Sequence, residues 1–211
     1  MAWFARFTRF GDVHLVYGQQ ANMSCGIASV MMCVFKINKL TPGATALHVE
    51  KDICDKYASA SGGAYQPETR GTHPDHLVTV LNGMQCGTWR WHTLSGAAAT
   101  RKILDVVGQT SGLGPTMSVN PLILGVDWST GGAHWIVVDT IRKFGGKSYV
   151  TICDPWDANV HVQGIADGSP FTYDAGKGGL AVDLWGTHKG EKSPYSASRR
   201  GVVKNWGLIC R

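Results

Sequence analysis

Three residues of this chain could together perform nucleophilic catalysis: Cys25, His134 and Asp154. A thiolate is a strong nucleophile, but the pKa of a free cysteine lies near 8.5, so a thiol needs help to ionise at neutral pH. A helix N-terminus and a neighbouring imidazole both favour the thiolate. Cys25 opens the apolar helical pattern of "CGIASVMMCVF", which predicts a place in the first turn of a helix. We expect Gly26 to keep the space around the sulfur open.

The base and the group that orients it are predicted on two successive strands. Among the eight histidines, His134 in "GGAHWIVVDT" opens an apolar strand directly after a glycine pair. Asp154 in "YVTICDPWDA" ends the next strand and precedes a proline. If these strands form an antiparallel hairpin, the start of one lies beside the end of the other, which brings the two residues within reach. The aspartate would then fix the imidazole tautomer by accepting from its second nitrogen.

An amide upstream of the thiol could stabilise an oxyanion. Gln19, six residues before Cys25 in "GQQANMSCG", could donate its side-chain N–H together with the Cys25 backbone N–H, and Gln20 is the rival for this role. Trp135 and Trp156 each lie within two residues of a proposed catalytic residue, so they are candidates for the substrate groove.

Each of these residues alone is more often structural than catalytic, and it is their ordered combination that favours catalysis. A further group, His73, Asp75 and His76, could suggest a metal site. It lacks a strong fourth ligand, and its sequence is typical of a capped helix start. We therefore expect no metal and no organic cofactor.

Composition narrows the class of protein. The chain has 211 residues, enough for a single domain over residues 1–211, and its net charge of +5 comes from scattered basic residues, which argues against a nucleic-acid partner. No apolar run approaches the ~20 residues of a membrane span. The start, "MAWFARFTRFG", has no continuous apolar core or cleavage site, so we expect no cleavable signal and synthesis in the cytoplasm. We also expect a monomer. None of the six cysteines forms a C-x-x-C pair, which favours free, mostly buried thiols.

The order of the elements predicts an α+β fold. A strand is expected at 12–18, and helices at 25–35, 44–58, 74–83 and 96–108, with Leu47, Val49, Ile53 and Tyr57 on the inward face of the second helix. A short strand is expected within 85–94, and only β-rich runs follow residue 115. We therefore expect a helical half, about 1–114, packed on a C-terminal antiparallel sheet, about 115–211.

The motifs, taken in order, resemble those of the papain-like cysteine peptidases. These motifs are a glutamine, Cys25-Gly26 at a helix start, Gly132-Ala133-His134-Trp135, and Asp154-Pro155. The resemblance extends to the compact bacterial forms, which include the leader peptidases that mature bacteriocins and the papain-like effector proteases that pathogens inject into host cells. It implies a papain-like architecture, a polypeptide substrate, and a route of export that needs no cleaved signal if the protein is such an effector. It also implies Cys25 as nucleophile, His134 as base, Asp154 as orienting residue and Gln19 as oxyanion donor.

Other functions fit the same residues. The same triad could serve deamidation, transglutamination or cleavage of cell-wall amides, although cell-wall amidases of this superfamily often carry a serine where this chain has Gly26. A non-enzymatic alternative is a binding module or toxin that uses the fold as a scaffold, with Cys25 merely buried and inert to thiol reagents.

Overall fold

The computed structural model describes residues 3–8, 10–38, 49–112, 120–175, 181–182 and 199–211. The helices in these ranges are α1 (Cys25–Ile37), α2 (Glu50–Ser61), α3 (Pro74–Asn82) and α4 (Gly96–Val107). The strands are β1 (Trp3–Thr8), β2 (Val13–Tyr17), β3 (Arg90–His92), β4 (Thr110–Ser111), β5 (Leu122–Trp128), β6 (Ala133–Phe144), β7 (Lys147–Asp154), β8 (Asn159–Ile165), β9 (Thr172–Asp174), β10 (Ala181–Val182), β11 (Arg200–Val202) and β12 (Leu208–Cys210). The expected α+β class is confirmed at this level, with helices and a mostly antiparallel sheet.

The larger sheet carries the residues of interest. Its main path runs β3-β12-β5-β6-β7-β8, with β9 and β11 paired beside β5 and β4 parallel to β6. A smaller sheet has the order β10-β1-β2. Strands β6 and β7 form the antiparallel hairpin expected from the sequence, with Val137 opposite Cys153. That register brings the start of β6 beside the end of β7.

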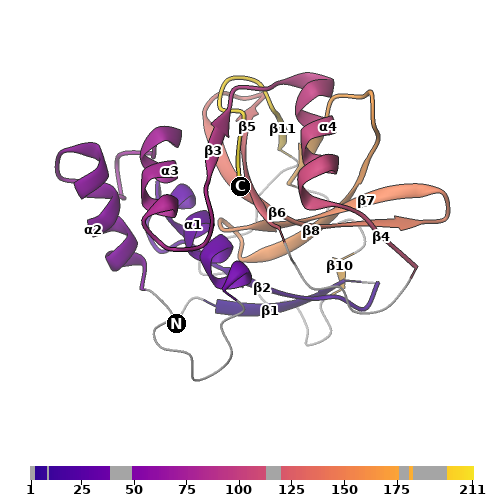
Figure 1. Cartoon of the computed structure of the whole chain (residues 1–211), viewed down its shortest axis with the longest axis horizontal. Coiled ribbons are helices and arrows are strands. Elements are labelled where there is room, and N and C mark those ends of the chain that lie inside the picture. Colours follow the sequence, from indigo (N-terminus) through magenta and orange to yellow (C-terminus); the bar gives the residue numbers. More distant parts are fainter. Residues whose placement is uncertain (1–2, 9, 39–48, 113–119, 176–180, 183–198) are drawn as a thin grey trace.

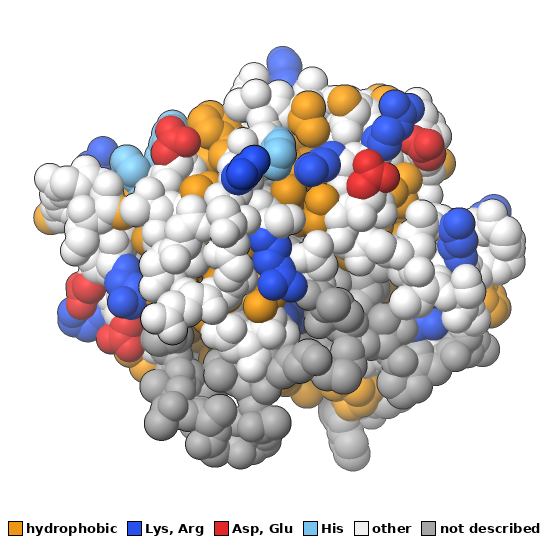
Figure 2. Space-filling view, in the orientation of Figure 1, with side chains coloured by type: hydrophobic (Ala, Val, Ile, Leu, Met, Phe, Trp, Pro, Cys, Tyr) orange, Lys and Arg blue, Asp and Glu red, His pale blue; other side chains and the backbone are white. Residues whose placement is uncertain are grey.

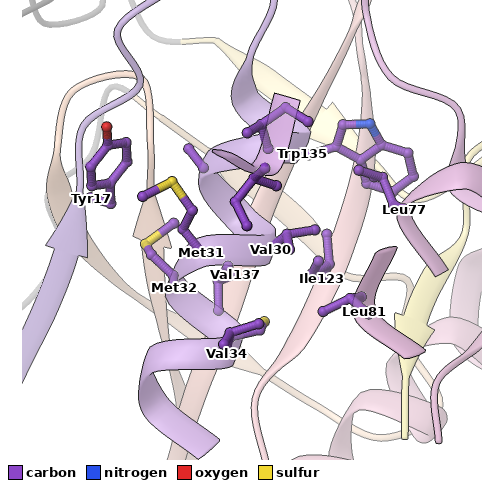
Figure 3. Packing of buried hydrophobic residues seen from close by; sticks show 14 of the residues in the cluster. Tyr17, Val30, Met31, Met32, Val34, Leu77, Leu81, Ile123, Trp135 and Val137 are labelled. Carbon is purple, nitrogen blue, oxygen red and sulfur yellow. The ribbon is translucent and has the colours of Figure 1, made fainter. Parts of the chain in front are cut away.

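Helices cover both faces of the larger sheet. In Figure 1, α1, α2 and α3 lie together on one side of the strands, and α4 lies on the other. Successive residues of β6 explain this arrangement, because Val137 packs in the core beneath α1, whereas Ile136 and Val138 pack in the core beneath α4. Figure 3 shows the α1 side of the core, where Val30 and Val34 of the helix meet the sheet.

The helix boundaries agree with most of the sequence-based expectations. Helix α1 begins at Cys25, α3 begins at Pro74 behind an N-cap at His73, and Gly108 follows the last residue of α4. The second helix starts later than expected, at Glu50, and the first part of the expected range, 44–48, lies outside the described residues. The prediction that Val49 faces inward was wrong. Val49 is the N-cap of α2 and is 58% exposed, because the chain has not yet entered the helix at this residue.

The N-terminal half is less purely helical than expected. Strand β1 was not predicted, although its sequence alternates, because its buried positions include Arg6 and Thr8 rather than apolar residues. Arg6 is accommodated because its Nε donates to the Ala158 carbonyl at 2.9 Å. The strand is therefore held to the rest of the molecule partly by a buried polar contact, which hydrophobic periodicity does not report.

The structure shows the charge distribution on one face and the length of the helices. Lys and Arg side chains on the face in Figure 2 are scattered among acidic and apolar ones and do not form a continuous basic patch. Among the described residues, no helix combines the length and apolar character needed to cross a membrane.

Candidate active site

Cys25 is the first residue of α1 and is half-buried. The helix begins here because its apolar residues Ile27, Val30, Met31 and Val34 pack inward at helical spacing. The first N–H groups of a helix have no partner within it and carry partial positive charge, which favours an anionic sulfur at this position.

Gly26 is required by close packing, and the expectation that it leaves open space was wrong. It is buried, and a Cβ at this position would lie 2.0 Å from Thr72 Oγ1 and 3.1 Å from Leu77 Cδ1. The loop before α3 therefore lies against the first turn of α1 just behind the thiol. A serine at this position, as in the cell-wall amidases, would need this loop to move.

His134 lies beside both the thiol and the aspartate. Its Nε2 lies 2.7 Å from Asp154 Oδ1, and the Cys25 side chain is a further hydrogen-bond partner of the ring. Because Nε2 is occupied by Asp154, Nδ1 is the nitrogen left for the sulfur. The imidazole is 6% exposed and stacks on Trp128, with ring centroids 5.7 Å apart and an interplanar angle of 19°.

The electrostatics of His134 and Asp154 favour an ion pair. Burial by itself lowers the pKa of His134, but the Asp154 carboxylate and then the Cys25 side chain raise it to about 10. Burial by itself raises the pKa of Asp154, but His134, His161 and Tyr173 lower it to about 2. At neutral pH the histidine is therefore an imidazolium, which is the form that accompanies a thiolate.

Asp154 accepts hydrogen bonds on both carboxylate oxygens. Oδ1 accepts from His134 and from the backbone N–H of Trp156 at 2.8 Å, and Oδ2 accepts from the Tyr173 hydroxyl at 2.5 Å. The residue is fully buried at the end of β7. Its neighbour Cys153 points to the other face of the sheet and packs in the core beneath α1, as the alternation of a strand predicts.

The two upstream glutamines lie in different surroundings. Gln19 is buried, and its Nε2 donates to the carbonyls of Ala21 and Asn22 at 2.8 and 3.1 Å, in the loop that leads into Cys25. Its backbone N–H donates to the Pro155 carbonyl at 2.8 Å, which ties this loop to the turn after Asp154. Gln20 is exposed, and its backbone N–H donates to Glu50. The Gln19 amide is therefore engaged within this loop, neither glutamine is among the residues that line the cavity at the thiol, and the oxyanion role stays a prediction for either.

A cavity of about 570 Å³ opens at the thiol and the imidazole. Four tryptophans line it, Trp128, Trp135, Trp156 and Trp206, so both tryptophans singled out from the sequence border the cavity. The remaining lining comes from the start of α1, the loop before α3, the β5–β6 turn and one cation: Asn22, Met23, Cys25, Gly71, Thr72, His73, Gly131, Gly132, Ala133, His134 and Arg199. A cleft with the nucleophile and base on its wall and an aromatic lining is typical of a site for an extended organic substrate.

Two clusters of possible metal ligands occur among the described residues. In the first, His14, Asp139 and Cys153 lie together, but Lys36 Nζ lies 2.7 Å from Asp139 Oδ2 and already supplies a positive charge. In the second, Asp154, Asp157 and His161 lie together, but both oxygens of Asp154 are occupied by the donors described above. Neither cluster is therefore assigned to a metal. The predicted capped helix start at His73 is confirmed, since its ring accepts from the Asp75 N–H at 3.4 Å.

Three contributors to the site were not found in the sequence. Tyr173 comes from β9 and carries no motif, Trp128 ends β5, and Thr72 lies in a polar loop. Trp128 could have been suspected, because it stands at the end of a strand just before the glycine pair that precedes His134. The other two become visible only when β9 and the loop before α3 are placed in space.

Comparisons with known proteins leave the family open. The chain matches no protein-family model. No curated protein is significantly similar to it in sequence. The function therefore has to be argued from the geometry.

Proposed function

We propose that the protein is a thiol hydrolase of papain-like architecture, and specifically a cysteine peptidase acting on a polypeptide. The observation that carries this proposal is the connected set of Cys25, His134 and Asp154 at the wall of one cavity, with the His134–Asp154 bond at 2.7 Å. A structural histidine needs neither a thiol at a helix start on one side nor a cavity at that thiol.

The reaction would proceed in two steps. The Cys25 thiolate attacks the scissile carbonyl carbon, and the oxyanion that forms is stabilised by the Cys25 backbone N–H and by the Gln19 amide, which would have to release one of its two carbonyl acceptors to donate to it. The His134 imidazolium gives its Nδ1 proton to the leaving amine, which departs and leaves an acyl-thioester on Cys25. His134, now neutral, removes a proton from a water molecule that attacks the thioester. The carboxylic acid product is released, and the thiolate–imidazolium pair is restored.

The remaining residues support this chemistry. Asp154 keeps the imidazole oriented and stabilises its charged form. Trp128 covers one face of the His134 ring and limits the access of water to it. The aromatic walls of the cavity would contact the side chains of a peptide on either side of the scissile bond.

The proposal is tested with a fluorogenic peptide library and an epoxide reagent for cysteine peptidases. We expect turnover and covalent labelling at Cys25 in the native protein, and loss of both in Cys25→Ala and His134→Ala. Cys54→Ala is the matched control, since Cys54 is also half-buried but lies in α2, outside the cavity lining. A folded protein that neither turns over peptides nor labels would contradict the proposal, and incorporation of a primary amine into a glutamine substrate in place of cleavage would assign the triad to transglutamination.

A further inference from the structure

The carboxylate of Asp154 has one oxygen that the triad does not use. Oδ1 faces His134, whereas Oδ2 faces β9 and receives the Tyr173 hydroxyl at 2.5 Å. A hydrogen bond to an ionised group is roughly twice as strong as one between neutral groups. Both ends of this one are buried, since neither Asp154 nor Tyr173 has exposed surface.

The Tyr173 ring is fixed by its aromatic neighbours while its hydroxyl donates to Asp154. The ring packs edge-on against the His161 ring, with centroids 5.5 Å apart and an interplanar angle of 87°. It also contacts the Trp128 ring, with centroids 5.9 Å apart. Strand β9 is itself fixed to β8, because the Gln163 side chain donates to the Asp174 carbonyl at 2.7 Å and accepts from its N–H at 3.1 Å. The position of the hydroxyl is therefore set by the fold of two strands.

A second carboxylate lies close to Asp154. Asp157 lies in the same buried cluster as Asp154 and His161, and a like charge at this range opposes the ionisation of either carboxyl. His161 offsets part of the repulsion, since its Nε2 lies 2.9 Å from Asp157 Oδ2. The charged or titratable groups around Asp154 are thus His134 on β6, Tyr173 on β9, His161 on β8 and Asp157 in the β7–β8 turn.

We propose that Tyr173 is a positioning residue of the active site, whose hydroxyl holds the Asp154 carboxylate turned so that Oδ1 meets His134. The inference rests on the proposed function for its catalytic meaning. Its physical content is a coupling that runs from Tyr173 through Asp154 to His134, and that coupling can be measured with or without turnover.

The test compares wild type with Tyr173→Phe, which removes the donor and keeps the ring. Without the donor Asp154 stays ionised, but its carboxylate is no longer held in one orientation and can turn Oδ1 away from His134, so the imidazolium loses its aligned partner and its pKa falls. Loss of a hydrogen bond to a charged group corresponds to a factor of about 10–100, so we expect the His134 titration, followed by NMR of ¹⁵N-histidine, to move down by about one pH unit or more. A ring that Asp154 no longer aligns also holds the thiolate less firmly, so the rate of Cys25 alkylation at pH 6 should fall about tenfold.

A matched control and a second probe keep the result interpretable. Tyr149→Phe removes a hydroxyl from β7, where the ring packs on Phe10 at 5.6 Å, and should leave both readouts unchanged. If Tyr173→Phe does not fold, a 4-fluorophenylalanine placed at this position fills the volume of the hydroxyl without a donor, and it should lower the His134 titration and the Cys25 alkylation rate as expected for Tyr173→Phe.

The outcomes separate the two proposals. A His134 titration that is the same in wild type, Tyr173→Phe and the fluorinated protein would overturn the role of Tyr173, even if Cys25 proves highly reactive. A shifted titration in a protein whose Cys25 is unreactive would support the coupling and overturn the peptidase proposal.

Discussion

Replacing Asp154 with asparagine separates the charge of this residue from its hydrogen bonds. An asparagine oxygen at the place of Oδ1 can still accept from His134 and from the Trp156 N–H. The amide nitrogen at the place of Oδ2 can donate to the Tyr173 oxygen, whose hydroxyl hydrogen can rotate away. The substitution therefore removes one buried negative charge and leaves the geometry nearly intact.

The size of the effect follows from the His134 pKa. Burial lowers this pKa, yet with Asp154 present it rises from the usual 6.5 to about 10, which corresponds to a stabilisation of the imidazolium of up to about 5 kcal/mol. Without the charge, burial is opposed only by the Cys25 side chain, so we expect the pKa of His134 to fall by at least about two units in Asp154→Asn.

The same coupling should appear in stability. A raised histidine pKa contributes stability that is complete below about pH 6.5 and is lost as pH rises through about 10. The lowered pKa of Asp154 gives stability that is present above about pH 4 and is lost as pH falls through about 2. The difference in unfolding free energy between wild type and Asp154→Asn should therefore be largest between about pH 4 and 6.5.

The assays are the NMR titration of His134, urea unfolding at a series of pH values, and Cys25 alkylation. Asp154→Ala serves as the comparison, because it removes both the charge and the orientation and should slow alkylation and turnover further than Asp154→Asn. A His134 pKa that is equal in wild type and Asp154→Asn, or a stability difference that does not vary with pH, would refute the reasoning.

Three further changes test other parts of the structure. Gly26→Ala should destabilise the protein by about 1–3 kcal/mol, because its methyl group would lie 2.0 Å from a threonine oxygen. The control Gly63→Ala, whose methyl group would meet nothing within 4 Å, should be nearly neutral. Thermal unfolding measures both variants, and equal effects would show that the contact at Gly26 is not restrictive. Gln19→Ala should lower kcat about 10²-fold without changing the alkylation of Cys25, and the exposed Gln20→Ala should not; a reversed result would give the oxyanion role to Gln20. Asp139→Asn should cost about 3–5 kcal/mol in urea unfolding, because it leaves a buried lysine without its counter-charge, and a change below 1 kcal/mol would show that this ion pair is not stabilising.

The sequence predicts the residues of the triad better than their surroundings. Cys25, His134 and Asp154 each stand at the end of an element whose pattern is regular, so the helix start and the hairpin geometry could be anticipated and the three side chains do lie together. Tyr173 could not be anticipated, because its place depends on how β9 pairs with β11, a contact between distant segments.

The errors have physical causes as well. Gly26 was interpreted as making space, whereas the loop that carries Thr72 fills that space, and local sequence does not report which loop will approach a helix. Strand β1 was missed because its buried Arg6 finds a carbonyl partner far along the chain, which makes a polar residue acceptable in the interior. The α+β class was predictable because it depends on the order of elements and not on such contacts.

The measurement to make first is the rate of iodoacetamide labelling against pH in the native protein, with each cysteine quantified by mass spectrometry. Cys54 is the internal standard, because it is also half-buried and burial raises its pKa to about 11. The account predicts that Cys25 labels rapidly well below pH 8, that Cys54 does not, and that His134→Ala slows Cys25 to the rate of an ordinary thiol. If Cys25 labels no faster than a free cysteine thiol across this range, or only after unfolding, the thiol is not activated and the catalytic account is contradicted.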